Sequence, residues 1–249
     1  MTLIYGHRGA CALLPENTLP SFERALDDGA NALESDVHLT RDGHVVLSHD
    51  STGRRMANIS AAISSCDLDE VQSWDVGWGF EHEGERPFVG EGYRIPSLEE
   101  MLGAFPEVRL NLDVKQSNPS MVASLLSTLR RAGAEHRVTL ASFHQGVLKE
   151  LRKAQFSGTL ALGVREMRML LTVPRSMLTL RKGLGHRAQI PTHWGPVRFD
   201  SNWFMGKCEE VGIKVDFWTI NDAAEARRLV ELGAAGIMTD NPAIIKLTT

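Results

Sequence analysis

The sequence has few cysteines, no long apolar run and no excess of basic residues. Its three cysteines, Cys11, Cys66 and Cys208, are odd in number and widely spaced, which favours reduced thiols in a cytosol over a disulfide framework or a zinc site. No apolar run approaches the roughly 20 residues of a membrane-spanning helix. Residues 1–5 lack the charged and apolar regions of an export signal. We therefore expect a cytoplasmic protein without a transmembrane segment.

The charge balance bears on the class of partner. Lys and Arg total 27 against 31 for Asp and Glu, which gives a net charge of -4 and no basic surplus of the kind that nucleic-acid binding requires. We therefore expect a small-molecule ligand and no nucleic-acid partner. The chain has 249 residues, of which 43% are hydrophobic and 23% charged, so it can bury a large core and is neither disordered nor fibrous.

Short apolar runs alternate with amphipathic segments along most of the chain, a pattern typical of parallel strands joined by helices. The strand candidates are residues 3–6, 32–37, 45–48, 109–114, 138–142, 159–164, 188–190, 214–218 and 235–239. This is one strand more than a (β/α)8 barrel needs. Either 45–48 or 188–190 is the surplus strand, and periodicity does not choose between them. We predict an α/β fold, a single TIM-type barrel domain over residues 1–249.

Two stretches interrupt this alternation. Residues 51–94, after the strand that ends at His49, are rich in Gly and aromatic residues, and we expect this insertion to form or cover the active site. In residues 166–185, Met and Leu alternate with Arg and Lys. A lipid-contacting surface is one interpretation; an outer helix broken at Pro174 is the favoured one.

Four polar groups lie at the carboxyl ends of predicted strands, where barrel enzymes carry their reactive side chains. They are His7–Gly9, Glu34–Asp36, His49–Asp50 and Asp113–Lys115. Residues two apart on a strand point to the same face, so the carboxylates of Glu34 and Asp36 share one face. We expect all four groups to meet at one mouth of the barrel.

The acidic members of these groups predict a metal site. Carboxylates of Glu34, Asp36 and Asp113 gathered in a partly buried mouth repel one another by several kcal/mol per close pair unless a cation compensates them. A ligand set made only of oxygen favours a hard ion, Mg²⁺ or Ca²⁺, over zinc. The spacing does not decide between these two ions.

A series of motifs resembles the glycerophosphodiester phosphodiesterase family over nearly the whole chain and in the family's order. The motifs are His7–Gly9, Pro15–Thr18, Glu34–Val37, Thr40–Gly43, His49–Asp50, Ile95–Glu100, Leu110–Lys115, Ser142–Phe143, Phe217–Asp222 and Gly236–Pro242. The resemblance implies a metal-dependent hydrolase that splits a glycerophosphodiester into glycerol 3-phosphate and an alcohol. Residues 166–200 match least.

The resemblance also implies roles for individual residues. His7 and His49 match the family's acid and base histidines, and Arg8 and Lys115 match cations that meet the phosphate. Glu34 and Asp36 match its metal-binding pair. Asp113 stands where many members carry Glu as a third ligand. Phe143 and Trp218 lie at strand ends, where aromatic residues either line the glycerol pocket or fill the barrel core.

The chemical requirements of phosphodiester hydrolysis agree with this function. A cation on the nonbridging oxygens reduces the charge that repels a nucleophile, and a proton donor improves a poor alkoxide leaving group. Histidine serves either proton role near neutral pH. Neither the order of the two histidines nor the nucleophile, water or the glycerol 2-hydroxyl, follows from the sequence.

Two other functions are weighed against this one. A lysophospholipase D would use the aromatic insertion and residues 166–185 to hold an acyl chain. A barrel that binds a phosphorylated ligand without cleaving it would need only the cations, so both histidines and three acids argue against it. The chain departs from the family at one place, where Arg55–Ala57 stands instead of an Arg-Thr-Thr stretch. This departure affects the predicted shape of the leaving-group pocket.

Overall fold

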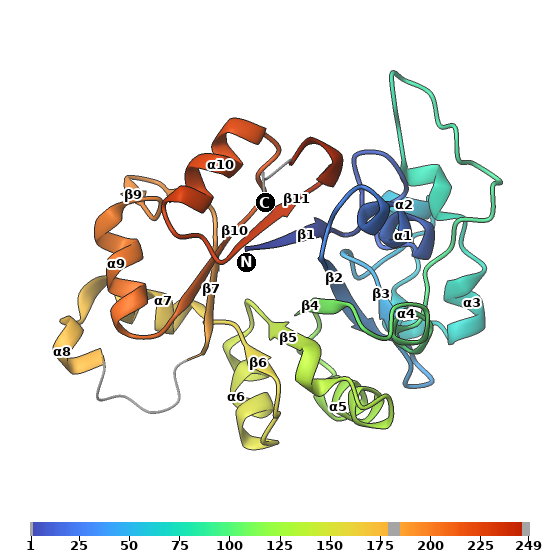
Figure 1. The fold of residues 1–249 in the computed structure, drawn as a ribbon. Coiled ribbons are helices and arrows are strands. Elements are labelled where there is room, and N and C mark those ends of the chain that lie inside the picture. The colour runs from blue at the N-terminus through green and yellow to red at the C-terminus, as the bar shows by residue number, and fades with distance from the viewer. Residues whose placement is uncertain (1, 179–184, 246–249) are drawn as a thin grey trace.

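Eight parallel strands form a nearly closed barrel with helices around it (Figure 1), as predicted. The computed structural model describes residues 2–178 and 185–245. The barrel strands are β1 (Leu3–His7), β2 (Ala32–Leu39), β4 (Arg109–Val114), β5 (Val138–Ala141), β6 (Thr159–Leu160), β7 (Arg187–Ile190), β10 (Lys214–Phe217) and β11 (Gly236–Thr239). They pair in the order β6-β5-β4-β2-β1-β11-β10-β7. A parallel bridge between Ala161 and Arg187 joins the two ends of this order.

The surplus strand candidate is residues 45–48. Strand β3 (Val45–Leu47) pairs antiparallel with β2, with Val37 opposite Leu47, and stands outside the barrel order. Candidate 188–190 is barrel strand β7. The predicted strand 159–164 was too long, because helix α7 already begins at Val164.

Amphipathic helices connect the barrel strands and cover their outer face. They are α1 (Leu19–Asp27), α4 (Leu98–Ala104), α5 (Val122–Arg131), α6 (Gln145–Lys153), α7 (Val164–Thr172), α8 (Arg175–Leu178), α9 (Asn202–Glu210) and α10 (Ala223–Glu231). Helix α1 is capped by Thr18, and α4 begins with a capping box of Ser97 and Glu100, which satisfies backbone N–H groups at the helix start. The break between α7 and α8 falls at Pro174, as expected. Leu180, Arg181 and Lys182 lie outside the described residues.

Two hydrophobic clusters fill the space between the barrel and its helices. One contains Phe22, Leu33 and Leu112, and the other contains Phe204 and Phe217, all with exposures of 0%. Each such side chain contributes roughly 1.5–3 kcal/mol by burial. Residues of the barrel strands also form a small separate cluster of Tyr5, Ala32 and Met238. Polar residues of the strands contact one another as well, since Gln189 donates to Asn111. Among the described helices, none has the length and apolar character that crossing a membrane requires.

The insertion has a small core of its own. It contains α2 (Arg54–Ala57), α3 (Leu68–Gln72) and two short 3-10 helices (Ile63–Ser65 and Val76–Gly79). Its buried residues include Ile63, Val71 and Trp74. The Phe88 ring contacts the rings of Phe80 and Tyr93, with ring centroids 5.0 Å apart in both pairs. The aromatic residues of this segment therefore pack on one another.

Candidate active site

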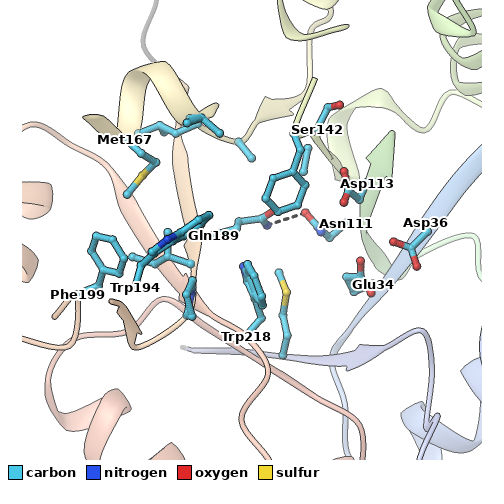
Figure 2. Close-up of a pocket in the computed structure, with 18 of the residues that line it drawn as sticks. Glu34, Asp36, Asn111, Asp113, Ser142, Met167, Gln189, Trp194, Phe199 and Trp218 are labelled. Carbon is cyan, nitrogen blue, oxygen red and sulfur yellow. Dashed lines mark hydrogen bonds between the residues drawn. The ribbon is translucent and has the colours of Figure 1, made fainter. Parts of the chain in front are cut away.

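The predicted site residues come together at the end of the barrel formed by the carboxyl ends of the strands. A cavity of about 590 Å³ opens there (Figure 2), within the size range of small-molecule sites. All nine residues singled out in the sequence line it: His7, Arg8, Glu34, Asp36, His49, Asp113, Lys115, Phe143 and Trp218. Their roles remain predictions, but their juxtaposition is a property of the fold.

A tight turn after β1 positions the first group. Arg8 and Gly9 both have positive φ, 51° and 87°, and a Cβ on Gly9 would lie 2.4 Å from Ser21 Oγ. Only glycine fits this position without strain. The turn directs the backbone N–H of Arg8 to Glu34 Oε2, at 3.1 Å, and so fixes the end of β1 against that of β2.

His7 is held from behind by the end of the last strand. Its Nδ1 lies 2.6 Å from Asp240 Oδ1, and its Nε2 lies 3.9 Å from Glu34 Oε2. Burial lowers the pKa of His7, but the hydrogen bond with Asp240 and the charge of Glu34 outweigh it, so the pKa is raised. Burial raises the pKa of Asp240, yet hydrogen bonds from His7, Cys11 and Asn221 bring it to about 2. Asp240 is therefore ionised, and its partner His7 is a strengthened base.

His49 has a similar arrangement. Its Nδ1 lies 2.7 Å from Asp50 Oδ1, and Arg55 donates from Nε to the other oxygen of Asp50 at 2.7 Å. Arg55 also donates to both oxygens of Glu16, at 2.7 and 3.0 Å, and Glu16 accepts from Arg8. A chain of charge-assisted hydrogen bonds thus connects the two predicted catalytic histidine loops.

Lys115 lies between two of the three acids. Its Nζ is 2.9 Å from Asp36 Oδ1 and 2.7 Å from Asp113 Oδ2. Burial raises the pKa of Asp36, but Lys115 and Arg8 outweigh it and lower the pKa below its ordinary value. Lys115 and Arg8 therefore supply a counter-charge that the sequence argument did not include.

Glu34 is the acid without such a direct cationic partner. Burial and the charge of Asp36 raise its pKa to about 7. Burial also raises the pKa of Asp113, and its buried Oδ1 has no hydrogen-bond partner. An unsatisfied buried carboxylate oxygen and an acid destabilised by acidic neighbours fit a site for a hard divalent cation.

The carboxylates of Glu34, Asp36 and Asp113 do not converge as closely as a complete ligand cage. Figure 2 shows them around one side of the cavity. Within the described residues, the only three-residue group whose ligand atoms all lie within 4.8 Å of one another is His7, Cys11 and Asp240. Hydrogen bonds to Asp240 account for that closeness, and burial raises the pKa of the Cys11 thiol, so this group favours the protonated thiol over a metal ligand.

From the sequence, Asn17 has two interpretations, contact with substrate or metal and, more simply, the cap of the helix that follows. Thr18, not Asn17, caps helix α1. Asn17 is buried, and its Nδ2 donates to Asp36 Oδ2 at 3.3 Å while its Oδ1 accepts from Ser35 Oγ at 2.7 Å. It therefore orients one of the predicted metal ligands.

The other half of the cavity is mainly apolar. It is lined by Val164, Met167, Leu171, Trp194, Val197 and Phe199, and Arg168 of α7 is the charged residue beside them. Figure 2 shows Met167, Trp194 and Phe199 on the side opposite the acids. Figure 2 shows Trp218 between the two halves. The Phe143 ring makes an edge contact with the Trp218 ring, with ring centroids 6.5 Å apart. The cavity thus joins a charged half to an apolar half.

The insertion does not form this apolar half. No residue of the range 51–94 lines the cavity, so the expectation that it forms or covers the active site is wrong. Its one described link to the site is Arg55, through Asp50 and Glu16. The apolar residues of this half, here called the apolar wall, come from α7 and from the hairpin of β8 (His193–Trp194) and β9 (Val197–Arg198).

Comparison with known proteins decides the family. The model of the glycerophosphoryl diester phosphodiesterase family matches residues 7–244. The chain belongs to this family. Membership confirms the resemblance seen in the motifs and identifies the chain as an enzyme, a phosphoric diester hydrolase.

Relatives and solved structures of the family cover nearly the whole chain. A glycerophosphodiester phosphodiesterase of Caldanaerobacter subterraneus is 29% identical over 97% of this chain and 95% of the relative. A lysophospholipase D of Mus musculus is 26% identical over 96% of this chain and 83% of the relative. The crystal structure of a glycerophosphoryl diester phosphodiesterase domain from Mycobacterium tuberculosis has a TM-score of 0.83 at 19% identity, with 97% of each chain covered.

One further structural neighbour has a ligand. An Oleispira antarctica phosphodiesterase, solved with the product sn-glycerol-3-phosphate, has a TM-score of 0.76 at 20% identity and covers 98% of this chain and 95% of its own. At these identities the two structures support the barrel fold of the family.

Proposed function

We propose that this phosphodiesterase hydrolyses glycerophosphodiesters to glycerol 3-phosphate and an alcohol by acid-base catalysis with His7 and His49. The observation that carries the proposal is that each imidazole has a carboxylate on Nδ1, at 2.6 Å for His7 and 2.7 Å for His49. Both histidines line the same cavity as three further carboxylates and two cations. This combination suits the cleavage of an anionic diester.

The hydrogen bonds give each histidine one free nitrogen. With Nδ1 engaged by Asp240 or Asp50, Nε2 is the atom that exchanges a proton with the substrate. One histidine takes a proton from the nucleophile, water or the glycerol 2-hydroxyl, and the other protonates the departing oxygen. Such proton transfers contribute roughly 10²- to 10⁴-fold to a rate.

Charged residues of the cavity bind the phosphodiester. Arg8 and Lys115 meet its oxygens, and Glu34, Asp36 and Asp113 hold a divalent cation, Mg²⁺ or Ca²⁺. Dependence on a divalent metal is general in the family. When bound, such an ion neutralises charge on the nonbridging oxygens. Asn17, through its hydrogen bond to Asp36, keeps one ligand in place.

A second substrate class is favoured by the apolar half of the cavity. An acyl chain would contact Met167, Trp194 and Phe199, which line this half of the cavity. Removing a chain from water against such a wall is favourable by about 0.8 kcal/mol per methylene. Lysophospholipase D activity is therefore the alternative. In that case the apolar half of the cavity, and not the insertion, would hold the acyl chain.

We also propose that residues 1–249 act as one catalytic domain in the cytoplasm. The pairing of β1 with β11 supports the first part, because the first and last strands complete one barrel. The cytoplasmic location is supported by the free thiols of Cys11, Cys66 and Cys208.

A substrate and metal screen tests the proposal. Glycerophosphocholine, glycerophosphoethanolamine and lysophosphatidylcholine are each incubated with Mg²⁺, Ca²⁺, Mn²⁺ or a chelator, and the phosphate-containing products are identified. We expect glycerol 3-phosphate from the first two with metal and none with chelator. Metal-dependent thermal stabilisation without turnover on any substrate would instead support a barrel that only binds its ligand.

A further inference from the structure

A second cavity lies at the opposite end of the barrel. It has a volume of about 300 Å³ and is lined by the first residues of six barrel strands: Leu3, Arg109, Val138, Thr159, Arg187 and Lys214. None of the nine residues of the candidate active site takes part in it. It is therefore a separate cavity.

The lining of this cavity, here called the lower cavity, is basic. It includes Arg109, His136, Arg137, His186, Arg187 and Lys214, and no Asp or Glu is among the lining residues. Such a concentration contrasts with the net charge of -4 of the whole chain. Cations gathered around one space repel each other, and a bound anion would remove that cost.

Internal partners engage only part of this charge. Arg187 forms a buried ion pair with Asp216, with its Nε 2.5 Å from the carboxylate, and Arg137 donates to the carbonyl oxygen of Val108 at 2.5 Å. Within residues 2–178 and 185–245, the side chains of Arg109 and Lys214 make neither an ion pair nor a hydrogen bond. These two cations, from β4 and β10, are the ones available to a ligand.

Buried hydroxyl groups supply neutral donors in the same place. Tyr5 and Thr139, 2% and 8% exposed, line the lower cavity, and their hydroxyls make no hydrogen bond with any described residue. Burial and the charge of Asp216 raise the pKa of Tyr5 above its ordinary value, so its hydroxyl keeps its proton. Tyr5 and Thr139 belong to the cavity lining, so their hydroxyls can donate to the oxygen of a bound ligand.

We propose that the lower cavity binds a phosphate group, either inorganic phosphate or the phosphate of a small organic molecule. Tetrahedral oxyanions accept several hydrogen bonds at once, and they match a cavity with free cations on two strands and hydroxyl donors on others. The proposal is independent of the reaction at the other end of the barrel.

Equilibrium dialysis with radiolabelled inorganic phosphate tests the proposal. The metal-loaded wild-type protein is compared with a double variant, Arg109→Gln with Lys214→Gln. We expect the wild type to bind one more phosphate per chain than the variant, or to hold that phosphate about tenfold or more tightly. Phosphate inhibition of turnover reports on the active site and is expected to be equal in both proteins.

A matched variant controls for charge. Lys149→Gln with Lys153→Gln removes the same charge from the exposed face of α6, outside both cavities, and is expected to bind as the wild type does. Retained turnover shows that the double variant is folded. If the double variant has lost its turnover, the two single variants are measured instead. Equal phosphate binding by wild type and lower-cavity variants would overturn the proposal.

The same measurement distinguishes the two sources of the phosphate group. Unlabelled inorganic phosphate and unlabelled glycerol 3-phosphate are added in parallel series. Each series measures how much of the labelled phosphate is displaced from the site that the double variant lacks. Preferential displacement by glycerol 3-phosphate would identify an organic phosphate ligand. Equal or weaker displacement would identify the free anion.

Discussion

Asp240 Oδ1 lies 2.6 Å from His7 Nδ1, although the two residues are 233 positions apart in the sequence. The contact exists because β11 pairs with β1 in parallel, with Thr239 beside Gly6, so the residues that follow each strand meet. Asn221 holds the second oxygen of Asp240 at 2.6 Å. The last strand of the barrel thus sets the orientation and basicity of a histidine on the first.

Replacing Asp240 should impair catalysis more than binding. In Asp240→Asn, His7 loses the charge that raises its pKa and strengthens it as a base, so we expect kcat to fall by about 10²-fold or more with little change in KM. The pKa of His7 should also fall, which moves any limb of the pH-rate profile that reports His7 to lower pH. Steady-state kinetics across pH measures both effects.

Cys11 provides the matched control for this variant. Its thiol contacts the same Asp240 oxygen at 3.0 Å, but burial raises its pKa and keeps it neutral. Cys11→Ala should retain most of the wild-type kcat and its pH profile. A loss equal to that of Asp240→Asn would show that packing around the carboxylate, and not its charge on His7, sets the rate.

Metal binding should depend on Asp36 in particular. Asp36→Asn removes a predicted ligand charge, and we expect a loss of Mg²⁺ or Ca²⁺ affinity greater than the roughly 10- to 100-fold typical of removing a partner of a metal ligand. Titration calorimetry on chelator-treated protein measures this. Asn17→Ala, which removes the hydrogen bond to Asp36, should give the smaller loss. Wild-type affinity in both variants would contradict the assigned ligands.

The apolar wall and the insertion can be compared directly. Met167→Gln places a polar group in the apolar half of the cavity, so kcat/KM for lysophosphatidylcholine should fall about tenfold or more, while that for glycerophosphocholine stays unchanged. Phe88→Leu in the insertion should alter neither value. A selective loss with Phe88→Leu would return the acyl-chain site to the insertion.

Stability at low pH should report the start of helix α4. Burial raises the pKa of Glu100, but hydrogen bonds from Arg94 and Ser97 outweigh it and hold it at about 2, below the ordinary 4.5. A depressed pKa stabilises the folded state above the ordinary value, and this contribution is lost as pH falls from about 4.5 to about 2. The stability difference between wild type and Glu100→Gln, from chemical denaturation, should therefore shrink across that window. A stability difference that stays constant with pH would contradict the lowered pKa of Glu100.

The sequence predicted those features that depend on local pattern. Strand β4 was predicted with its bounds, and polar and apolar residues alternate along Arg109–Val114 with the period of a strand. The histidines and acids were found because barrel enzymes carry reactive groups at strand ends. The direction of β3 was not predictable in this way, since a short apolar run is the same in a parallel and an antiparallel pair.

The features that the sequence did not predict depend on contacts across the barrel. Asp240 becomes a partner of His7 only when the first and last strands pair. The apolar residues of α7 have the pattern of an outer helix, yet Met167 and Leu171 line the cavity. Aromatic richness in residues 51–94 does not distinguish rings that contact a ligand from rings that pack on one another.

The most direct test of the account is the turnover of His7→Ala and His49→Ala on glycerophosphocholine, with metal bound and folding verified by circular dichroism. We expect each variant to remain folded and to lose about 10²- to 10⁴-fold in rate. Turnover near the wild-type level in either folded variant would contradict the two-histidine mechanism.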